Sequence, residues 1–183
     1  VVGILAAAQT LVILTAGIDL SIGVIMVLSF VIMGNAVLHY GFPGPIAIVV
    51  GAAIAALCGY VNGLLVSRIK LPPFIVTLGT WNIIMAATLI YSANETLREA
   101  DLTAVTSWLH FFGTSFKIGP AVVTFGVIVM ILLYILLWYV LNYTAWGRYL
   151  YAVGDDPDAA QLSGIRVSRV LTTTYCLAGL IAG

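Results

Sequence analysis

The stretch that decides the fold class is residues 45–66, PIAIVVGAAIAALCGYVNGLLV, which contains no charged side chain. A helix that crosses the hydrocarbon core of a bilayer needs roughly 17–25 predominantly apolar residues, and this run meets that length. Within it, small residues recur at every fourth position, namely Gly51, Ala55, Gly59 and Gly63. Small residues let helix backbones approach closely in a membrane, so we expect this face to pack against another helix. Because Asn62 lies beside the face, the lining of a transport pathway is the alternative.

The composition of the whole chain is that of a membrane protein. Hydrophobic residues make up 62% of the 183 residues and charged residues only 8%, whereas a soluble domain carries about 25% charged residues. Polar surface could not cover a soluble fold of this composition. Seven basic and seven acidic residues leave no net charge, so the sequence offers no electrostatic attraction for nucleic acid.

Five further apolar runs extend the same pattern along the chain. They cover residues 1–17, 20–38, 74–92, 120–141 and 171–183. Inside hydrocarbon every backbone group must find its partner within the protein, and none of these runs alternates as barrel strands do. We therefore predict an all-α, polytopic transmembrane helix bundle that forms one domain over residues 1–183. The sequence lacks an initiator Met and stops inside an apolar run, so we expect this domain to be truncated at both ends.

The loops between the runs divide by charge. One set carries Arg68 and Lys70 (loop 67–72) and Arg148, Arg166 and Arg169 (loop 142–170), and the other carries only Arg98 and Lys117 (loop 93–119). Cytoplasmic loops are enriched in Lys and Arg, so loops 67–72 and 142–170 are predicted to be cytoplasmic and loop 93–119 to face outside.

The outer loop 93–119 is too polar to span a membrane. Leu102, Val105, Leu109 and Phe112 follow helical spacing within it, and we expect a helix lying flat on the outer interface. A docking surface for an external protein is the alternative.

One acidic residue, Asp19, falls between two apolar runs, where Gly17 and Gly23 flank a predicted helix break. We expect its carboxylate to cap the following helix by accepting hydrogen bonds from the amides near Ser21 and Ile22. An isolated acid at the bilayer centre costs about 2.5–3.5 kcal/mol on insertion scales, so a proton or ion site is the alternative. The runs contain no second acid to which a proton could be relayed.

Four side chains within the runs are candidates for a substrate pathway, namely Asn62, Thr77, Trp81 and Asn82. An aromatic ring can stack on the face of a sugar while an amide hydrogen-bonds its hydroxyls. Interhelical hydrogen bonding is the alternative. The sequence has no phosphate-binding loop, nucleophile elbow or paired metal-ligand motif, so we expect no catalytic residue, no metal and no cofactor.

Loop 142–170 is predicted to contain a short helix over Pro157 to Ser163. Asp156 is a favourable N-cap, Pro157 is typical of the first helical position, and Gly164 is typical of the position after the helix end. A two-turn helix gains little stability alone, so we expect it to dock on a partner, with the small Ala160 at the docking face.

Three blocks carry a resemblance to a known family. They are residues 15–23 (TAGIDLSIG), residues 62–66 and 71–79 (NGLLV and LPPFIVTLG), and residues 147–165 (GRYLYAVGDDPDAAQLSGI). With their spacing, these blocks resemble the membrane-spanning permease subunit of bacterial ABC sugar importers, the ribose/xylose/fructose group. Residues 91–96 (YSANET) and 144–149 (TAWGRY) are similar to the fructose-importing branch.

The resemblance implies an ATP-driven importer of a monosaccharide in the bacterial inner membrane. This chain would supply part of a ten-helix permease, from helix two to the start of helix seven. The implied partners are an ABC ATPase subunit, which would hydrolyse the ATP, a periplasmic sugar-binding protein and a second permease copy. A secondary transporter driven by an ion gradient is the alternative, although such proteins usually carry their coupling sites at the midplane.

The resemblance also implies a coupling helix that enters a cleft of the ATPase. Its residues are Asp158, Ala159, Ala160, Gln161, Leu162, Ser163 and Gly164. Many relatives carry a basic residue where this chain has Gln161, so the polar contacts of those relatives with their ATPase do not carry over.

Overall fold

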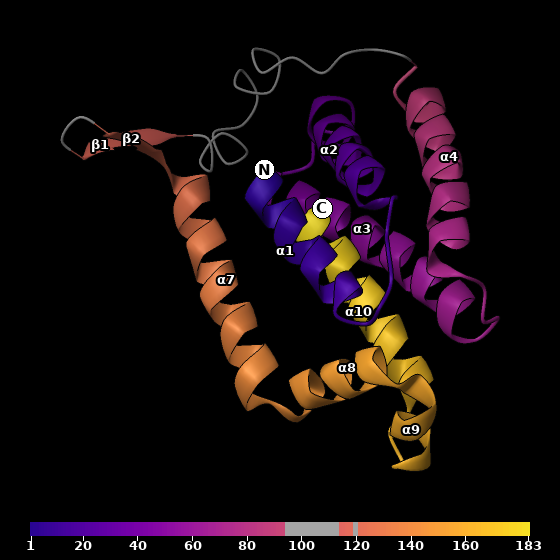
Figure 1. Cartoon of the computed structure of the whole chain (residues 1–183). Coiled ribbons are helices and arrows are strands. Elements are labelled where there is room, and N and C mark those ends of the chain that lie inside the picture. Colours follow the sequence, from indigo (N-terminus) through magenta and orange to yellow (C-terminus); the bar gives the residue numbers. More distant parts are fainter. Residues whose placement is uncertain (94–113, 119–120) are drawn as a thin grey trace.

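The computed structural model describes residues 1–93, 114–118 and 121–183, which form helices apart from one pair of strands (Figure 1). The elements are α1 (Val2–Ile13), α2 (Ile22–Leu38), α3 (Gly44–Ser67), α4 (Pro73–Tyr91), β1 (Ser115–Ile118), β2 (Ala121–Thr124), α7 (Phe125–Tyr143), α8 (Ala145–Asp155), α9 (Pro157–Leu162) and α10 (Val167–Ala182). Of these helices, α3, α4 and α7 are long and apolar enough to cross a membrane, and α1, α2 and α10 are shorter apolar helices. The predicted all-α membrane class is confirmed.

The bounds of three predicted spans were wrong at one end. Helix α1 ends at Ile13 rather than at residue 17, because the chain turns at Ala16, whose φ of 56° is left-handed and cannot continue a right-handed helix. Helix α10 begins at Val167, before the predicted residue 171. Helix α7 begins at Phe125 rather than at residue 120, because the preceding residues form a strand.

The two strands are a feature that the sequence analysis did not predict. β1 and β2 are antiparallel, with Ser115 opposite Thr124 and Ile118 opposite Ala121. The first residues of the predicted span are β-branched at Val122, Val123 and Thr124, and such residues favour strands. An apolar run by itself does not distinguish the two structures. The helix predicted around residues 102–112 lies outside the described residues.

Helix α10 packs against α1, α2 and α3 (Figure 1). Ala55, Gly59 and Gly63 of the small-residue face of α3 contact α10, whereas Gly51 lies against Met33 and Ser29 of α2. A Cβ placed on Gly59 would meet the backbone carbonyl of Tyr175, and one placed on Gly63 would lie 2.8 Å from the Cα of Thr172. In the structure this face therefore packs against other helices, as the helix-packing interpretation predicted.

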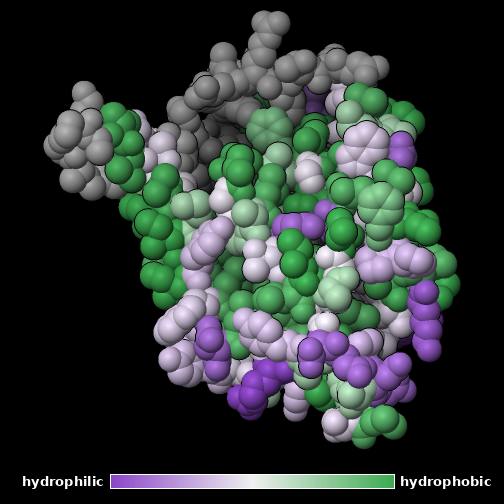
Figure 2. Space-filling view, in the orientation of Figure 1, coloured by the Kyte–Doolittle hydropathy of each residue, from purple (hydrophilic) through white to green (hydrophobic). Residues whose placement is uncertain are grey.

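The end of the molecule that carries α8 and α9 is polar. Figure 2 shows a broad hydrophobic surface with hydrophilic residues gathered at that end. Helix α8 lies across this end between α7 and α10 (Figure 1). At the end of α7, the ring of Tyr143 packs on Trp138 and Tyr139, with centroids 5.4 and 5.5 Å apart. Aromatic clusters of this kind mark a membrane interface.

Candidate functional site

The turn between α1 and α2 holds the one buried carboxylate of the described residues. Asp19 is only 5% exposed, and its Oδ1 accepts hydrogen bonds from the Ser21 amide at 2.7 Å and from the Ser21 hydroxyl at 2.6 Å. The Ser21 contact is one of those expected, but Ser21 is itself the N-cap of α2 and no side chain caps the first turn of that helix, so Asp19 orders the turn before α2 rather than capping the helix. The functional role of Asp19 stays a prediction.

The two glycines of the predicted helix break differ in their surroundings. A Cβ on Gly17 would lie 2.7 Å from the hydroxyl of Tyr175, so α10 requires a small residue at this turn. Gly23 lies in the first turn of α2, and a Cβ there would meet nothing within 4 Å. Gly17 is therefore constrained by packing, and Gly23 is not.

Side chains from α3 and α4 bind this same turn. The Asn62 amide donates to the Ser21 hydroxyl at 2.8 Å, and the Thr77 hydroxyl accepts the Leu20 amide at 3.2 Å. Both Asn62 and Thr77 are completely buried. These contacts join α3 and α4 to the turn that precedes α2, and the buried polar side chains around this turn are called the turn cluster below.

The turn cluster also contains a residue that the sequence analysis missed. Tyr175 of α10 is completely buried, and its hydroxyl and the Asn62 Oδ1 have no hydrogen-bond partner within the described part of the chain. A tyrosine in the middle of an apolar run was the only available signal, since its position beside Gly17 depends on the packing of α10.

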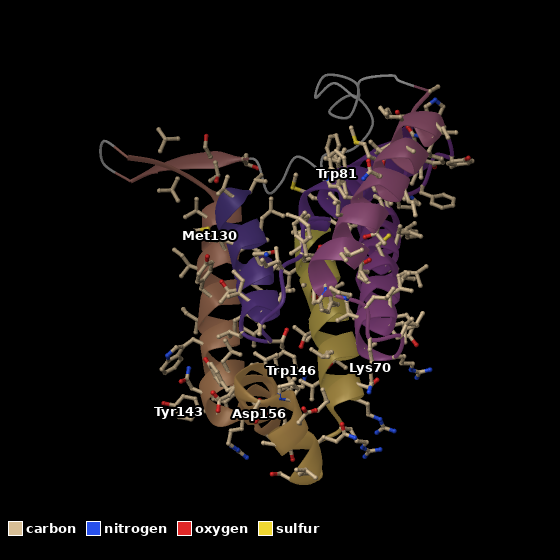
Figure 3. All side chains as sticks on the ribbon, turned by 45° about the vertical axis from the view of Figure 1, so that its right-hand side comes forward. Lys70, Trp81, Met130, Tyr143, Trp146 and Asp156 are labelled. Atoms are coloured by element: carbon tan, nitrogen blue, oxygen red, sulfur yellow. The ribbon has the colours of Figure 1, made fainter. Side chains whose placement is uncertain are left out.

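The other two candidates for the pathway lie elsewhere. Trp81 and Asn82 are exposed on α4, and Asn82 Nδ2 donates at 2.9 Å to the Leu78 carbonyl of its own helix. Figure 3 places Trp81 well away from Lys70 along the length of the molecule. The four predicted pathway residues are thus divided into a buried pair and an exposed pair.

Helix α9 forms at the polar end, as its capping residues predicted. Asp156 (Figure 3) accepts the amides of Asp158 at 2.9 Å and Ala159 at 3.0 Å. Pro157 is the first residue of the helix, and Gly164 follows its end with a φ of +85°. The side chains of Asp158, Ala159, Gln161, Leu162 and Ser163 are exposed.

The expectation that Ala160 lies at the docking face of α9 was wrong. Ala160 is 4% exposed and belongs to a hydrophobic cluster with Leu150, Val153 and Val170. It therefore faces α8 and α10 of its own chain. Leu162 is 90% exposed, so it is the large apolar side chain that α9 presents outward.

The polar side chains of the described residues do not gather as metal ligands do. No group of three or more His, Cys, Asp or Glu side chains that could hold a metal ion occurs within residues 1–93, 114–118 and 121–183. The clustered polar groups are suited to hydrogen bonding between helices and at helix ends.

Comparison with known proteins places the chain in a family. A model of the family described as the branched-chain amino acid transport system, permease component, matches residues 1–183. The chain is 63% identical over 181 residues to the fructose import permease of Rhizobium meliloti, covering 99% of this chain and 50% of the relative. It is 36% identical over 180 residues to the ribose import permease of Bacillus subtilis strain 168, covering 98% of this chain and 54% of the relative.

The corresponding ribose import permease of Escherichia coli K12 is 33% identical, with the same coverage. The chain therefore spans about half the length of these curated relatives. No solved structure matches it. Since the family model covers every residue, the chain belongs to the family of branched-chain amino acid transport system permease components.

Proposed function

We propose that this chain is part of the permease subunit of an ATP-driven importer that carries a monosaccharide across the bacterial inner membrane. The observation that carries the proposal is the 63% identity, over 99% of the chain, to a fructose import permease. The family description names branched-chain amino acids. The relatives that are similar over nearly the whole chain, however, are named as fructose and ribose import permeases. A fructose-like or ribose-like sugar is therefore the proposed cargo.

The proposed importer contains three partners of this permease chain. An ABC ATPase binds at the cytoplasmic end, a periplasmic sugar-binding protein delivers the cargo, and a second permease copy completes the pathway. Helix α9 is the proposed coupling helix. Leu162 and Ala159, which are exposed, form its docking face, and Leu162 is the large apolar side chain of that face.

The packing supplies a route by which movement of α9 reaches the membrane. Ala160 joins α9 to Leu150 of α8 and Val170 of α10 in one buried cluster. Such a close-packed cluster transmits displacement because it cannot be compressed. Helix α10 then contacts α3 at Gly59 and Gly63. ATP-driven closure of the partners would thus shift α10 against α3 and change access to the pathway.

The test is sugar uptake by the full-length permease reconstituted with its ATPase and binding protein. We expect fructose or ribose uptake that requires ATP, continues after the proton gradient is collapsed, and is not inhibited by leucine. Uptake that stops with the gradient would favour a secondary transporter, and uptake of leucine instead of sugar would refute the proposed cargo.

The docking face is tested by Leu162→Asp. Because Leu162 is 90% exposed, this change should leave the membrane abundance of the permease normal while sharply reducing recovery of the ATPase with it. Ala160→Trp is the contrasting variant, since it overfills the internal cluster and should lower the stability of the permease itself. Normal ATPase recovery with Leu162→Asp would contradict the assigned face.

A further inference from the structure

A pocket of about 370 Å³ lies between α8, the end of α9 and the start of α10. This volume falls within the range of about 300–1,000 Å³ that is typical of small-ligand pockets. Its lining combines two arginines, two aromatic residues, two hydroxyl side chains and two aliphatic residues: Arg166, Arg169, Trp146, Tyr149, Ser163, Thr173, Ile165 and Val170, together with Gly164. Val170 of this lining also belongs to the Ala160 cluster, and Ser163 and Gly164 end the proposed coupling helix.

The charges of the pocket favour an anion. Arg166 and Arg169 are exposed, and neither forms a hydrogen bond or an ion pair through its side chain within the described residues. Both lie at the N-terminus of α10, where no side chain caps the helix and the helix dipole adds positive potential. The neighbouring acids of the α8–α9 junction, which include Asp156, are not part of the lining.

The depth of the pocket in the membrane is indicated by its aromatic residues. Trp146 (Figure 3) donates from its indole nitrogen to the Thr173 hydroxyl at 3.1 Å, which fixes the ring at the pocket wall. The aromatic cluster around Tyr143 lies on the adjoining end of α7. Since Trp and Tyr concentrate at the level of lipid headgroups, the pocket lies at that level rather than in free solvent.

We propose that this pocket binds the headgroup of an anionic phospholipid from the cytoplasmic leaflet. Arg166 and Arg169 contact the phosphate, with the hydroxyl of Ser163 as a further donor. The side chain of Ile165 and the indole ring of Trp146 contact the first carbons of the acyl chains. Anionic lipids of the cytoplasmic leaflet attract basic residues that lie beside a membrane helix, as Arg166 and Arg169 do at the start of α10. The inference uses the predicted orientation of the chain and does not depend on what the permease transports.

The test measures the association of spin-labelled phosphatidylglycerol and phosphatidylcholine with the full-length permease in bilayers. We expect a preference for phosphatidylglycerol that falls roughly tenfold in Arg166→Gln or Arg169→Gln, since each variant removes a charge-assisted hydrogen bond to the phosphate, which is stronger than general attraction to a basic surface. Arg68→Gln is the matched control, because Arg68 is an exposed arginine at the same end that does not line the pocket. It should leave the preference unchanged.

Several outcomes would overturn the proposal. An equal loss with Arg68→Gln would mean general attraction to the charged surface, and displacement of the lipid by millimolar inorganic phosphate would mean a free-anion site. Loss of the ATPase from the Arg166→Gln and Arg169→Gln complexes, with lipid preference intact, would assign the pocket to a protein partner. Elution of each variant as a single peak at the wild-type volume in size-exclusion chromatography controls for misfolding.

Discussion

Replacing Gly63 by alanine should destabilise the packing of α3 against α10. The added Cβ would lie 2.8 Å from the Thr172 Cα, 3.0 Å from the Thr172 carbonyl oxygen and 3.1 Å from the Tyr175 Cβ. Two of these atoms belong to the backbone, so they cannot move without moving the helix. Relief of the contact requires α10 to separate by roughly half an ångström, which costs each nearby contact about a quarter of its dispersion energy.

Two opposing effects set the magnitude. Overpacking of a close-packed site costs about 1–3 kcal/mol, while alanine improves helix propensity by up to about 1 kcal/mol over glycine. We therefore expect Gly63→Ala to lower the free energy of unfolding by up to about 2 kcal/mol. Gly59→Ala should be worse, because its Cβ would meet the Tyr175 carbonyl and the Gly179 Cα.

The matched control is Gly79→Ala on α4. Gly79 is also inside a membrane helix, but a Cβ there would meet nothing within 4 Å. It therefore gains helix propensity without a clash, and the difference between the two variants isolates the contact. Unfolding of the full-length protein by titration of a denaturing detergent, followed by tryptophan fluorescence, measures this difference. Equal stability of Gly63→Ala and Gly79→Ala would refute the close-packing argument.

Three further predictions concern the turn, the short helix and the orientation. Asp19→Asn should keep most transport, because Asn accepts the Ser21 amide about as well as Asp; vesicle uptake at matched protein level measures this. Asp156→Ala removes the acceptor of two α9 amides and should cost about 1 kcal/mol of local stability, seen as faster amide exchange in α9. Single cysteines at Ser67 or Ser163 should be protected from a membrane-impermeant thiol reagent in intact cells, whereas one at Thr114 should react.

Each of these predictions has a contrary result. Complete loss of transport in Asp19→Asn would favour an ionic role for the carboxylate. Unchanged exchange in Asp156→Ala would mean that other contacts hold the end of α9. Labelling of position 67 or 163 from outside would reverse the orientation predicted from the basic loops.

The membrane class, the helical architecture and the positions of α2, α3 and α4 followed from the sequence, because hydrocarbon allows few backbone structures and leaves long apolar runs to become helices. Helix α8, which lies within the predicted loop 142–170, did not. The cap of α9 was equally predictable, since Asp156, Pro157 and Gly164 act on backbone groups within a few residues of themselves. Sequence rules for helix formation and capping therefore predict the structures that depend on contacts between residues close in sequence.

The tertiary structure decided which side chains meet. Ala160 turned inward onto Leu150 and Val170, and Tyr175 came to lie beside Gly17, because both positions depend on how α10 packs against the rest of the chain. The packing of α2 against α3 joined Asn62 to Ser21 across 41 positions of sequence. Spacing along one helix defines a face, but the partner of that face is set by the packing of the whole bundle.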